Sequence, residues 1–214
     1  ENTNADNLFI APTTATLDQL FKLPRAGMTT DSSSFSPSNP NQTCAAGVTP
    51  IVGGASINLN GATINAACGS CSGSGINTGV TTLTLATSPA LTITATGGTI
   101  GRNQGGEATD AIGVYQGSGG APDTALQAGE SLSFGLIGYT ARKFGITLYG
   151  FDAGEQAQLT FKNGGTNVGS YTATSAATTN ITPGGAFNEV VVQAVGSSAF
   201  WVQTVKFCDA ITSC

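Results

Sequence analysis

Apolar and polar residues alternate with a period of two along much of the chain, most clearly in residues 129–161. Three successive runs there place apolar side chains at every second position: Leu132, Phe134 and Leu136; Phe144, Ile146 and Leu148; and Ala157, Leu159 and Phe161. A period of two is typical of a strand with one buried face. Residues 152–155 carry the Asp and Gly of a turn. The pattern therefore predicts three consecutive strands of an antiparallel meander.

Similar runs continue from residue 44 to the end of the chain and predict nine or ten short strands, with turn signals about every 8–12 residues. The predicted fold class is an all-β antiparallel sandwich, jelly-roll-like, over residues 44–214, with an extended N-terminal arm. Alternation in the last strand predicts two faces: Phe200, Val202, Thr204 and Lys206 on one, and Trp201, Gln203, Val205 and Phe207 on the other.

Two segments are harder to place. Residues 55–66 contain Asn60-Gly61, which favours either a tight hairpin or a single strand with a bulge at Gly61. Residues 175–185 are rich in Ser, Thr, Asn and Gly and are expected to form a loop.

Residues 1–43 are expected to form an arm and a linker rich in Ser, Thr, Asn and Pro. A short strand is predicted at 8–10 and two helical turns at 16–23. The arm can fold back over an edge of its own sandwich, add to a neighbouring subunit's sheet as in donor-strand assembly, or stay disordered. Its apolar residues are Leu8, Phe9, Ile10, Leu17, Leu20 and Phe21.

Composition narrows the classes of partner. Charged residues make up 9% of the 214, against about 25% in typical soluble domains. The formal net charge is −5, and the seven Lys and Arg are scattered, so nucleic acid is not an expected partner. There is no apolar window of about 20 residues, so no membrane span is expected. The start at Glu1 is interpreted as a processed terminus of a secreted or cell-surface protein.

The five cysteines are disulfide candidates, because export places a protein in an oxidising compartment: Cys44, Cys68, Cys71, Cys208 and Cys214. Cys208 and Cys214 are close enough in sequence to close a small terminal loop. The CxxC spacing of Cys68 and Cys71 lies among Gly and Ser in a β-rich chain, which favours a structural disulfide over redox chemistry. An odd count leaves one thiol free or bonded to another chain.

Some segments resemble a module of exported bacterial surface and matrix proteins of the exosortase-sorted, PEP-CTERM type. The matching pieces are residues 91–96, Ile112-Gly113-Val114 and the GESLSF run at 129–134, with 168–169 and 200–207 in the same outline. The similarity covers about residues 80–208. Ala128 stands near the place where that module usually has Asp, and residues 209–214 do not match the C-terminal anchor of such proteins. The resemblance implies a jelly-roll-like sandwich on the envelope or in the matrix, and no activity.

Acidic residues offer a candidate calcium site. Ca²⁺ takes six to eight oxygen ligands, and residues 107–130 hold four acids and no base. Asp209 follows the last strand and completes the predicted ligand set of Glu107, Asp110, Glu130 and Asp209. The alternative is that these acids are solvated loop residues. With no His in the chain, a Ser-His-Asp or Cys-His site is excluded, and we do not expect an enzyme.

Two functional hypotheses follow. The first is a structural protein that packs with copies of itself into a filament, sheath or surface layer. The second is a monomeric adhesin or carbohydrate-binding module, for which exposed aromatic side chains would form the platform. The candidates for that platform are Trp201, Tyr139, Tyr149 and Tyr171. Asn41 and Asn180 begin Asn-x-Thr sequons and are candidates for glycosylation.

Overall fold

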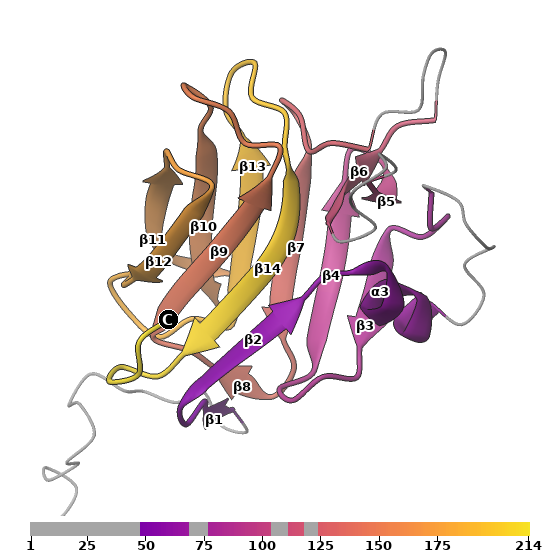
Figure 1. The fold of residues 1–214 in the computed structure, drawn as a ribbon. Coiled ribbons are helices and arrows are strands. Elements are labelled where there is room, and N and C mark those ends of the chain that lie inside the picture. Colours follow the sequence, from indigo (N-terminus) through magenta and orange to yellow (C-terminus); the bar gives the residue numbers. More distant parts are fainter. Residues whose placement is uncertain (1–47, 69–76, 104–110, 118–123) are drawn as a thin grey trace, which may run out of the picture. The chain divides into compact units, whose positions relative to one another are not determined.

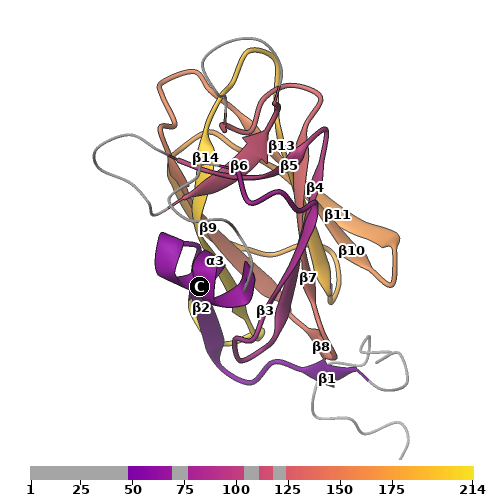
Figure 2. The same cartoon turned by 90° about the vertical axis from the view of Figure 1, so that its right-hand side faces the viewer.

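A computed structural model describes residues 48–68, 77–103, 111–117 and 124–214. The predicted arm, with Leu8, Phe9, Ile10, Leu17, Leu20 and Phe21, lies outside the described residues. Cys44, Cys71, Glu107 and Asp110 also lie outside them. The described part is an all-β sandwich in which two antiparallel sheets pack face to face (Figures 1 and 2). The predicted fold class is therefore confirmed.

Eight strands pair in the nested order of a jelly roll. The first sheet contains the order β12-β9-β14-β6 and the second contains β11-β10-β13-β7. The pairs β6–β14, β7–β13, β9–β12 and β10–β11 are all antiparallel. In this double Greek key the first strand meets the last and each later strand meets the next one inward. The bounds are β6 (Ile112–Tyr115), β7 (Ser131–Leu136), β9 (Lys143–Tyr149), β10 (Ala157–Asn163), β11 (Thr166–Ala173), β12 (Ala177–Ile181), β13 (Glu189–Ala194) and β14 (Trp201–Cys208).

The N-terminal part of the sandwich widens both sheets. β3 (Thr82–Leu85) and β4 (Leu91–Thr96) extend the second sheet beyond β7, and β5 (Thr99–Arg102) extends the first beyond β6. β2 (Gly54–Asn58) also pairs with β14, toward the end of that strand. The short β1 (Thr49–Pro50) pairs in parallel with β8 (Tyr139–Thr140), which lies in the connection between β7 and β9.

The segment with Asn60-Gly61 is neither a hairpin nor a bulged strand, so both predictions for it were wrong. β2 ends at Asn58, and the helix α3 (Gly61–Cys68) follows. Asn60 caps this helix, because its side-chain Oδ1 accepts a hydrogen bond from the Thr63 N–H at 2.8 Å. Ile64 is fully buried and joins the helix to the core. The loop predicted at 175–185 was also wrong, since it contains β12.

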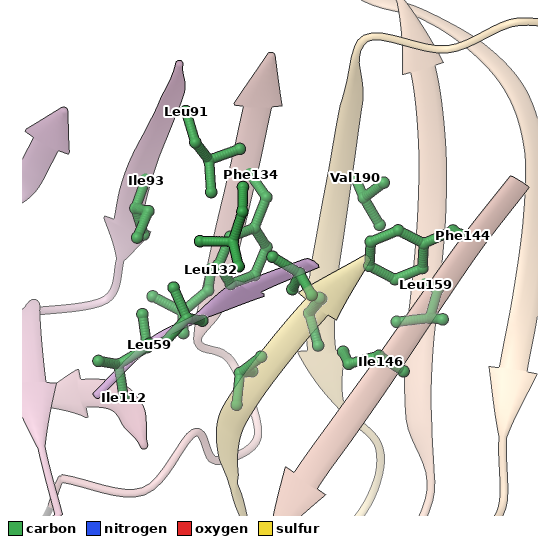
Figure 3. Close-up of a cluster of buried hydrophobic side chains, with 14 of the residues drawn as sticks. Leu59, Leu91, Ile93, Ile112, Leu132, Phe134, Phe144, Ile146, Leu159 and Val190 are labelled. Carbon is green, nitrogen blue, oxygen red and sulfur yellow. The ribbon is translucent and has the colours of Figure 1, made fainter. Parts of the chain in front are cut away.

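The core lies between the two sheets (Figure 3). The predicted inward residues of β7, β9 and β10 are all buried, which confirms the period-two reading of these strands. The predicted meander was wrong, because β9 lies in the first sheet whereas β7 and β10 lie in the second, separated by β13. Phe144 contacts the rings of Phe161, Phe187 and Phe207, with centroids 5.7, 6.4 and 5.4 Å away. These edge-on contacts add to the hydrophobic stabilisation that each buried ring provides.

The two faces predicted for β14 were wrong in their second half. The register of β14 against β9 shifts between Val202 and Thr204. A bulge adds one residue to a strand and so reverses the alternation beyond it. As a result, Phe200, Val202, Val205 and Phe207 are all buried.

Residues 124–126 pack on the outer side of β6, near the start of β14. The Leu126 N–H donates to the Phe200 carbonyl at 2.7 Å, and the Trp201 Nε1–H donates to Thr124 Oγ1 at 3.1 Å. A Cβ on Gly113 would overlap the carbonyl oxygen of Thr124. Gly113 is therefore required for close approach of a second backbone and not for turning the chain.

We expect Gly113→Ala to lower the free energy of unfolding by about 3 kcal/mol, the upper end of the usual cost of overpacking. Gly135→Ala is the matched control, because a Cβ on Gly135 meets only the Thr92 carbonyl oxygen at 3.9 Å. The control should change stability by no more than about 0.5 kcal/mol. Denaturant unfolding of both variants measures the difference. Equal stabilities would show that residues 124–126 do not pack on β6.

Candidate functional site

The acids predicted to bind calcium do not come together within the described residues. Glu130 directly precedes β7. It lies near the start of β14, because Leu126, four residues earlier in the chain, forms backbone hydrogen bonds with Phe200. Asp209 follows the last residue of β14. The eight residues of β14 span about 26 Å at 3.3 Å per residue. Glu130 and Asp209 therefore lie at opposite ends of the sandwich and cannot share one ion.

Glu130 has a local role in its turn. Its side chain is buried, and its Oε2 accepts a hydrogen bond from the Gln127 N–H at 2.8 Å. The Glu130 N–H in turn donates to the Gln127 carbonyl at 3.0 Å. This reciprocal pair closes the turn that enters β7. Across the described ranges, no group of three or more His, Cys, Asp or Glu is close enough to hold a metal ion.

Asp209 organises the C-terminal loop. Its Oδ1 accepts hydrogen bonds from the N–H groups of Ile211 and Thr212, at 2.9 and 2.6 Å. Its Oδ2 accepts one from the Gly53 N–H at 2.8 Å. The hydrogen bonds from Thr212 and Gly53 lower the pKa of Asp209 from 3.8 to about 2, because they stabilise the charged carboxylate.

The same loop is held in three further ways. Cys208 and Cys214 form a disulfide, as predicted, with their Cα atoms 5.8 Å apart. Asn180 Oδ1 accepts hydrogen bonds from the Cys214 N–H at 2.8 Å and the Ser213 hydroxyl at 3.3 Å. Lys143 Nζ donates to the Thr212 carbonyl at 3.2 Å. Residues 209–214 are thus held against the start of β2, β9 and β12. A chain terminus without such contacts is usually poorly ordered.

These contacts bear on two other predictions. Asn180 heads one of the two sequons, and its amide oxygen is used to hold the C-terminal residues; Asn41 lies outside the described residues. Cys68 is also disulfide-bonded.

The C-terminal loop presents an almost fully exposed apolar side chain, Ile211, at 90% exposure. Val52, at 92%, lies beside the same link, because the Gly53 carbonyl accepts from the Asp209 N–H at 2.9 Å. Ile137 and Tyr139, in the β7–β9 connection, are also exposed at this end of the sandwich. Figure 1 shows β1, β8, the start of β2 and the C-terminal loop together there. We name Val52, Ile137, Tyr139 and Ile211 the end patch.

The aromatic residues predicted to form a glycan platform do not gather in one place. Trp201 and Tyr149 are neighbours on the first sheet, with ring centroids 6.0 Å apart, and Trp201 is half-buried. Tyr171 lies on β11 in the second sheet, and Tyr139 belongs to the end patch. A separate open hollow of about 440 Å³ is lined by uncharged residues and one other tyrosine: Asn77, Gly97, Gly98, Thr99, Tyr115, Gln116 and Gly117.

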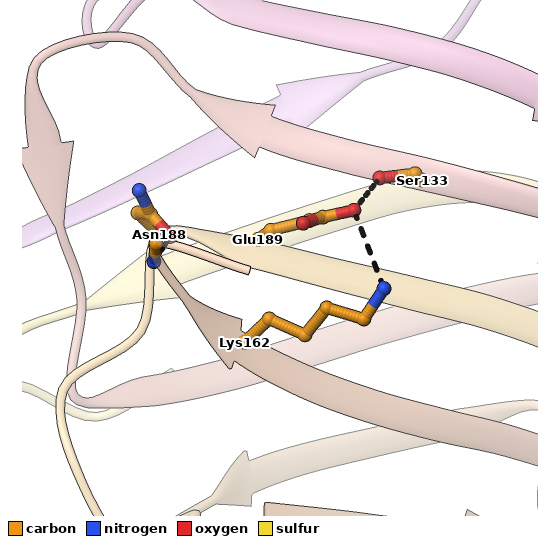
Figure 4. Close-up of polar contacts among 5 residues, drawn as sticks. Ser133, Lys162, Asn188 and Glu189 are labelled. Atoms are coloured by element: carbon orange, nitrogen blue, oxygen red, sulfur yellow. Dashed lines mark hydrogen bonds and ion pairs between the residues drawn. The ribbon is translucent and has the colours of Figure 1, made fainter. Parts of the chain in front are cut away.

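The outer face of the second sheet is almost uncharged. A row of side chains crosses it in register, from Thr94 through Ser133 and Val191 to Thr160. Figure 4 shows the ion pair found among the described residues, Lys162 with Glu189 at 4.0 Å, beside this row. Such exposed pairs contribute little to stability. Apart from this pair, the row presents three hydroxyl groups and the side chain of Val191 to a partner.

Comparison with protein-family models, curated proteins and solved structures finds no match for this chain. No helix in the described ranges has the length and apolar character needed to cross a membrane.

The lowered pKa of Asp209 predicts a pH dependence. A carboxylate with a folded-state pKa near 2 and an ordinary value of 3.8 stabilises the folded state above pH 3.8, and this contribution disappears as the pH falls through 2. We therefore expect the stability difference between the native protein and Asp209→Asn to shrink between pH 4 and pH 2. Denaturant unfolding across that range measures it, with Asp152→Asn, in an exposed turn, as the control. A difference that stays constant down to pH 2 would contradict this role.

Proposed function

We propose that the protein is an extracellular structural subunit that packs with copies of itself into a filament, sheath or surface layer. The end patch carries this proposal. Val52 and Ile211 are large β-branched side chains that are almost fully exposed at one end of the sandwich. Apolar side chains gathered at one exposed place are typical of surfaces that bind another chain.

The rigidity of the end patch strengthens the proposal. A disulfide, the three N–H groups on Asp209, and Asn180 all hold the loop that carries Ile211. Ordering a flexible loop on binding costs free energy, and a loop already ordered avoids that cost. The many contacts here therefore favour association through a preformed surface.

Composition supports the same function. Only 9% of residues are charged, and the outer face of the second sheet carries few charges. Burying an unpaired charge costs free energy. Copies with few charged residues can pack closely without this cost. The Cys208–Cys214 disulfide suits an extracellular location, since such bonds persist in oxidising compartments.

The direct test of the end patch is the double variant Val52→Ser/Ile211→Ser. We expect the native protein to form regular assemblies in negative-stain microscopy and sedimentation, and the variant to stay dispersed, because it loses the apolar contact. Tyr171→Ser, which removes a side chain 42% exposed on β11, is the control and should still assemble. All three proteins should unfold at similar denaturant concentrations. Assembly of the double variant at the native level would remove the end patch as the contact.

The arm provides a second test. Deleting residues 1–24 should abolish assembly and leave the sandwich folded, because residues 44–214 form a compact unit of their own. Circular dichroism and thermal unfolding check the fold, and microscopy checks assembly. If the truncated protein still polymerises, the arm is not the connector.

A second candidate function, binding of a glycan by a monomer, is favoured by the hollow beside Tyr115. Its lining combines one aromatic ring with amide and hydroxyl groups and several glycines. Asn77 is fixed there, because its Oδ1 accepts from the Thr99 hydroxyl at 2.6 Å and the Gly79 N–H at 2.7 Å. Dispersed native particles in microscopy, together with a glycan signal that Tyr115→Ala abolishes, would favour this function over assembly.

A further inference from the structure

β2 is a strand with one unpaired edge. On its paired side, the Leu59 N–H donates to the Gln203 carbonyl at 2.9 Å, and the Asp209 N–H donates to the Gly53 carbonyl at 2.9 Å. Both pairs belong to the β2–β14 register. Because backbone groups in an antiparallel strand alternate between its two sides, the backbone groups of the odd-numbered residues 53–59 point toward β14.

The even-numbered residues, Gly54, Ser56 and Asn58, therefore direct their N–H and C=O groups away from β14. All three residues are exposed, and no strand within the described part of the chain pairs with that side of β2. Figure 1 shows β14 along one side of β2 and no strand of the same sheet along the other.

The outermost strands of the two large sheets each have at least one protective feature among the described residues. Residues 78–80 bond to the outer side of β5 through Ile100, at 3.1 and 2.8 Å. Gly184 donates to the Val168 carbonyl of β11 at 3.1 Å. β12 is interrupted by a bulge at Asn180, where φ is 57°, and α3 packs beside β3. Covering segments and bulges are the usual means by which proteins prevent edge-to-edge pairing.

Among the described residues, no covering segment bonds to the free side of β2, and β2 has no bulge. Its sequence, Gly-Ala-Ser-Ile-Asn, has no charge and no proline, and its register against β14 is regular. An exposed, uncharged strand edge is a template for another strand. We propose that this edge accepts the apolar segment Leu8-Phe9-Ile10 from the N-terminal arm of a neighbouring copy. This proposal rests on the proposed assembly and names its connection.

The position and length of the arm support this occupant. β1 begins at Thr49, directly before β2, so the arm joins the sandwich at the end that carries the end patch. Residues 1–47 can extend up to about 160 Å, far beyond a neighbouring sandwich. In the proposed assembly the end patch lies against the next copy, so the arm leaves its own sandwich at the contact between the two.

Proline at position 56 isolates the proposed edge. The Ser56 N–H points away from β14, so Ser56→Pro removes a donor from the free edge and leaves the β2–β14 hydrogen bonds intact. Ser56→Thr keeps the N–H and is the matched control. Ser56→Lys blocks the same edge by charge without a change in the backbone. We expect Pro and Lys variants to fold like the native protein and not to polymerise, whereas the Thr variant assembles normally.

Mixing two full-length variants identifies the donor. Ser56→Pro keeps the arm and loses the edge, whereas Leu8→Ser/Phe9→Ser/Ile10→Ser keeps the edge and loses the arm's apolar run. Each alone should remain monomeric in sedimentation, and an equimolar mixture should form a one-to-one heterodimer that does not grow further. No heterodimer in the mixture, with each variant monomeric, would overturn transfer between copies and place the arm on its own β2.

The outcomes separate this proposal from the proposed function. Native protein that stays dispersed at all concentrations overturns the assembly itself. If the native protein assembles and the Ser56→Pro and Ser56→Lys variants assemble equally well, the β2 edge is not the acceptor. The proposed structural function would then still stand.

Discussion

The central strand β14 determines the rest of the structure, because among the described strands it alone pairs with three others. β9 follows one side of it, and the other side is divided between β6 near its start and β2 toward its end. Within the described part of the chain, this division leaves β2 without a further neighbour in its sheet. The end of β14 also leads directly into the disulfide and Asp209 that fix the C-terminal loop. The free edge and the end patch are thus two consequences of one strand's pairing.

Local alternation was sufficient to predict the fold class and the inward faces of β7, β9 and β10, since each is a regular strand with one buried side. It failed in β14, where the bulge depends on pairing with β9, a partner more than fifty residues away in sequence. It also failed at Asn60, because the same Asn-Gly pair suits a hairpin turn and a helix cap. In β12, most outward positions are polar and the bulge at Asn180 removes the alternation.

The candidate site was less predictable than the fold. Asp209 is predicted as a calcium ligand from its residue type and its place after the last strand, whereas its position opposite Gly53 depends on the β2–β14 register. A local signal was present, because an Asp followed by Ala-Ile-Thr can bond the N–H groups two and three residues ahead. The sequence gives no such signal for Val52 and Ile211. Their residue types are those of the core, and only the structure shows that they are exposed.

The free edge and the end patch would act together in assembly. In the proposed assembly, the covalent link between the arm and its own sandwich would raise the effective concentration of the arm at its own β2 edge. Capture by a neighbour must compete with that intramolecular pairing, and strand exchange alone gives the two states equivalent hydrogen bonds. In the proposed assembly the end patch would remove this balance, because Val52 and Ile211, exposed in a single copy, would be buried against the next copy. Such a contact would favour the exchanged state, and it would give the apolar end patch and the unpaired edge of β2 a joint role in the proposed assembly.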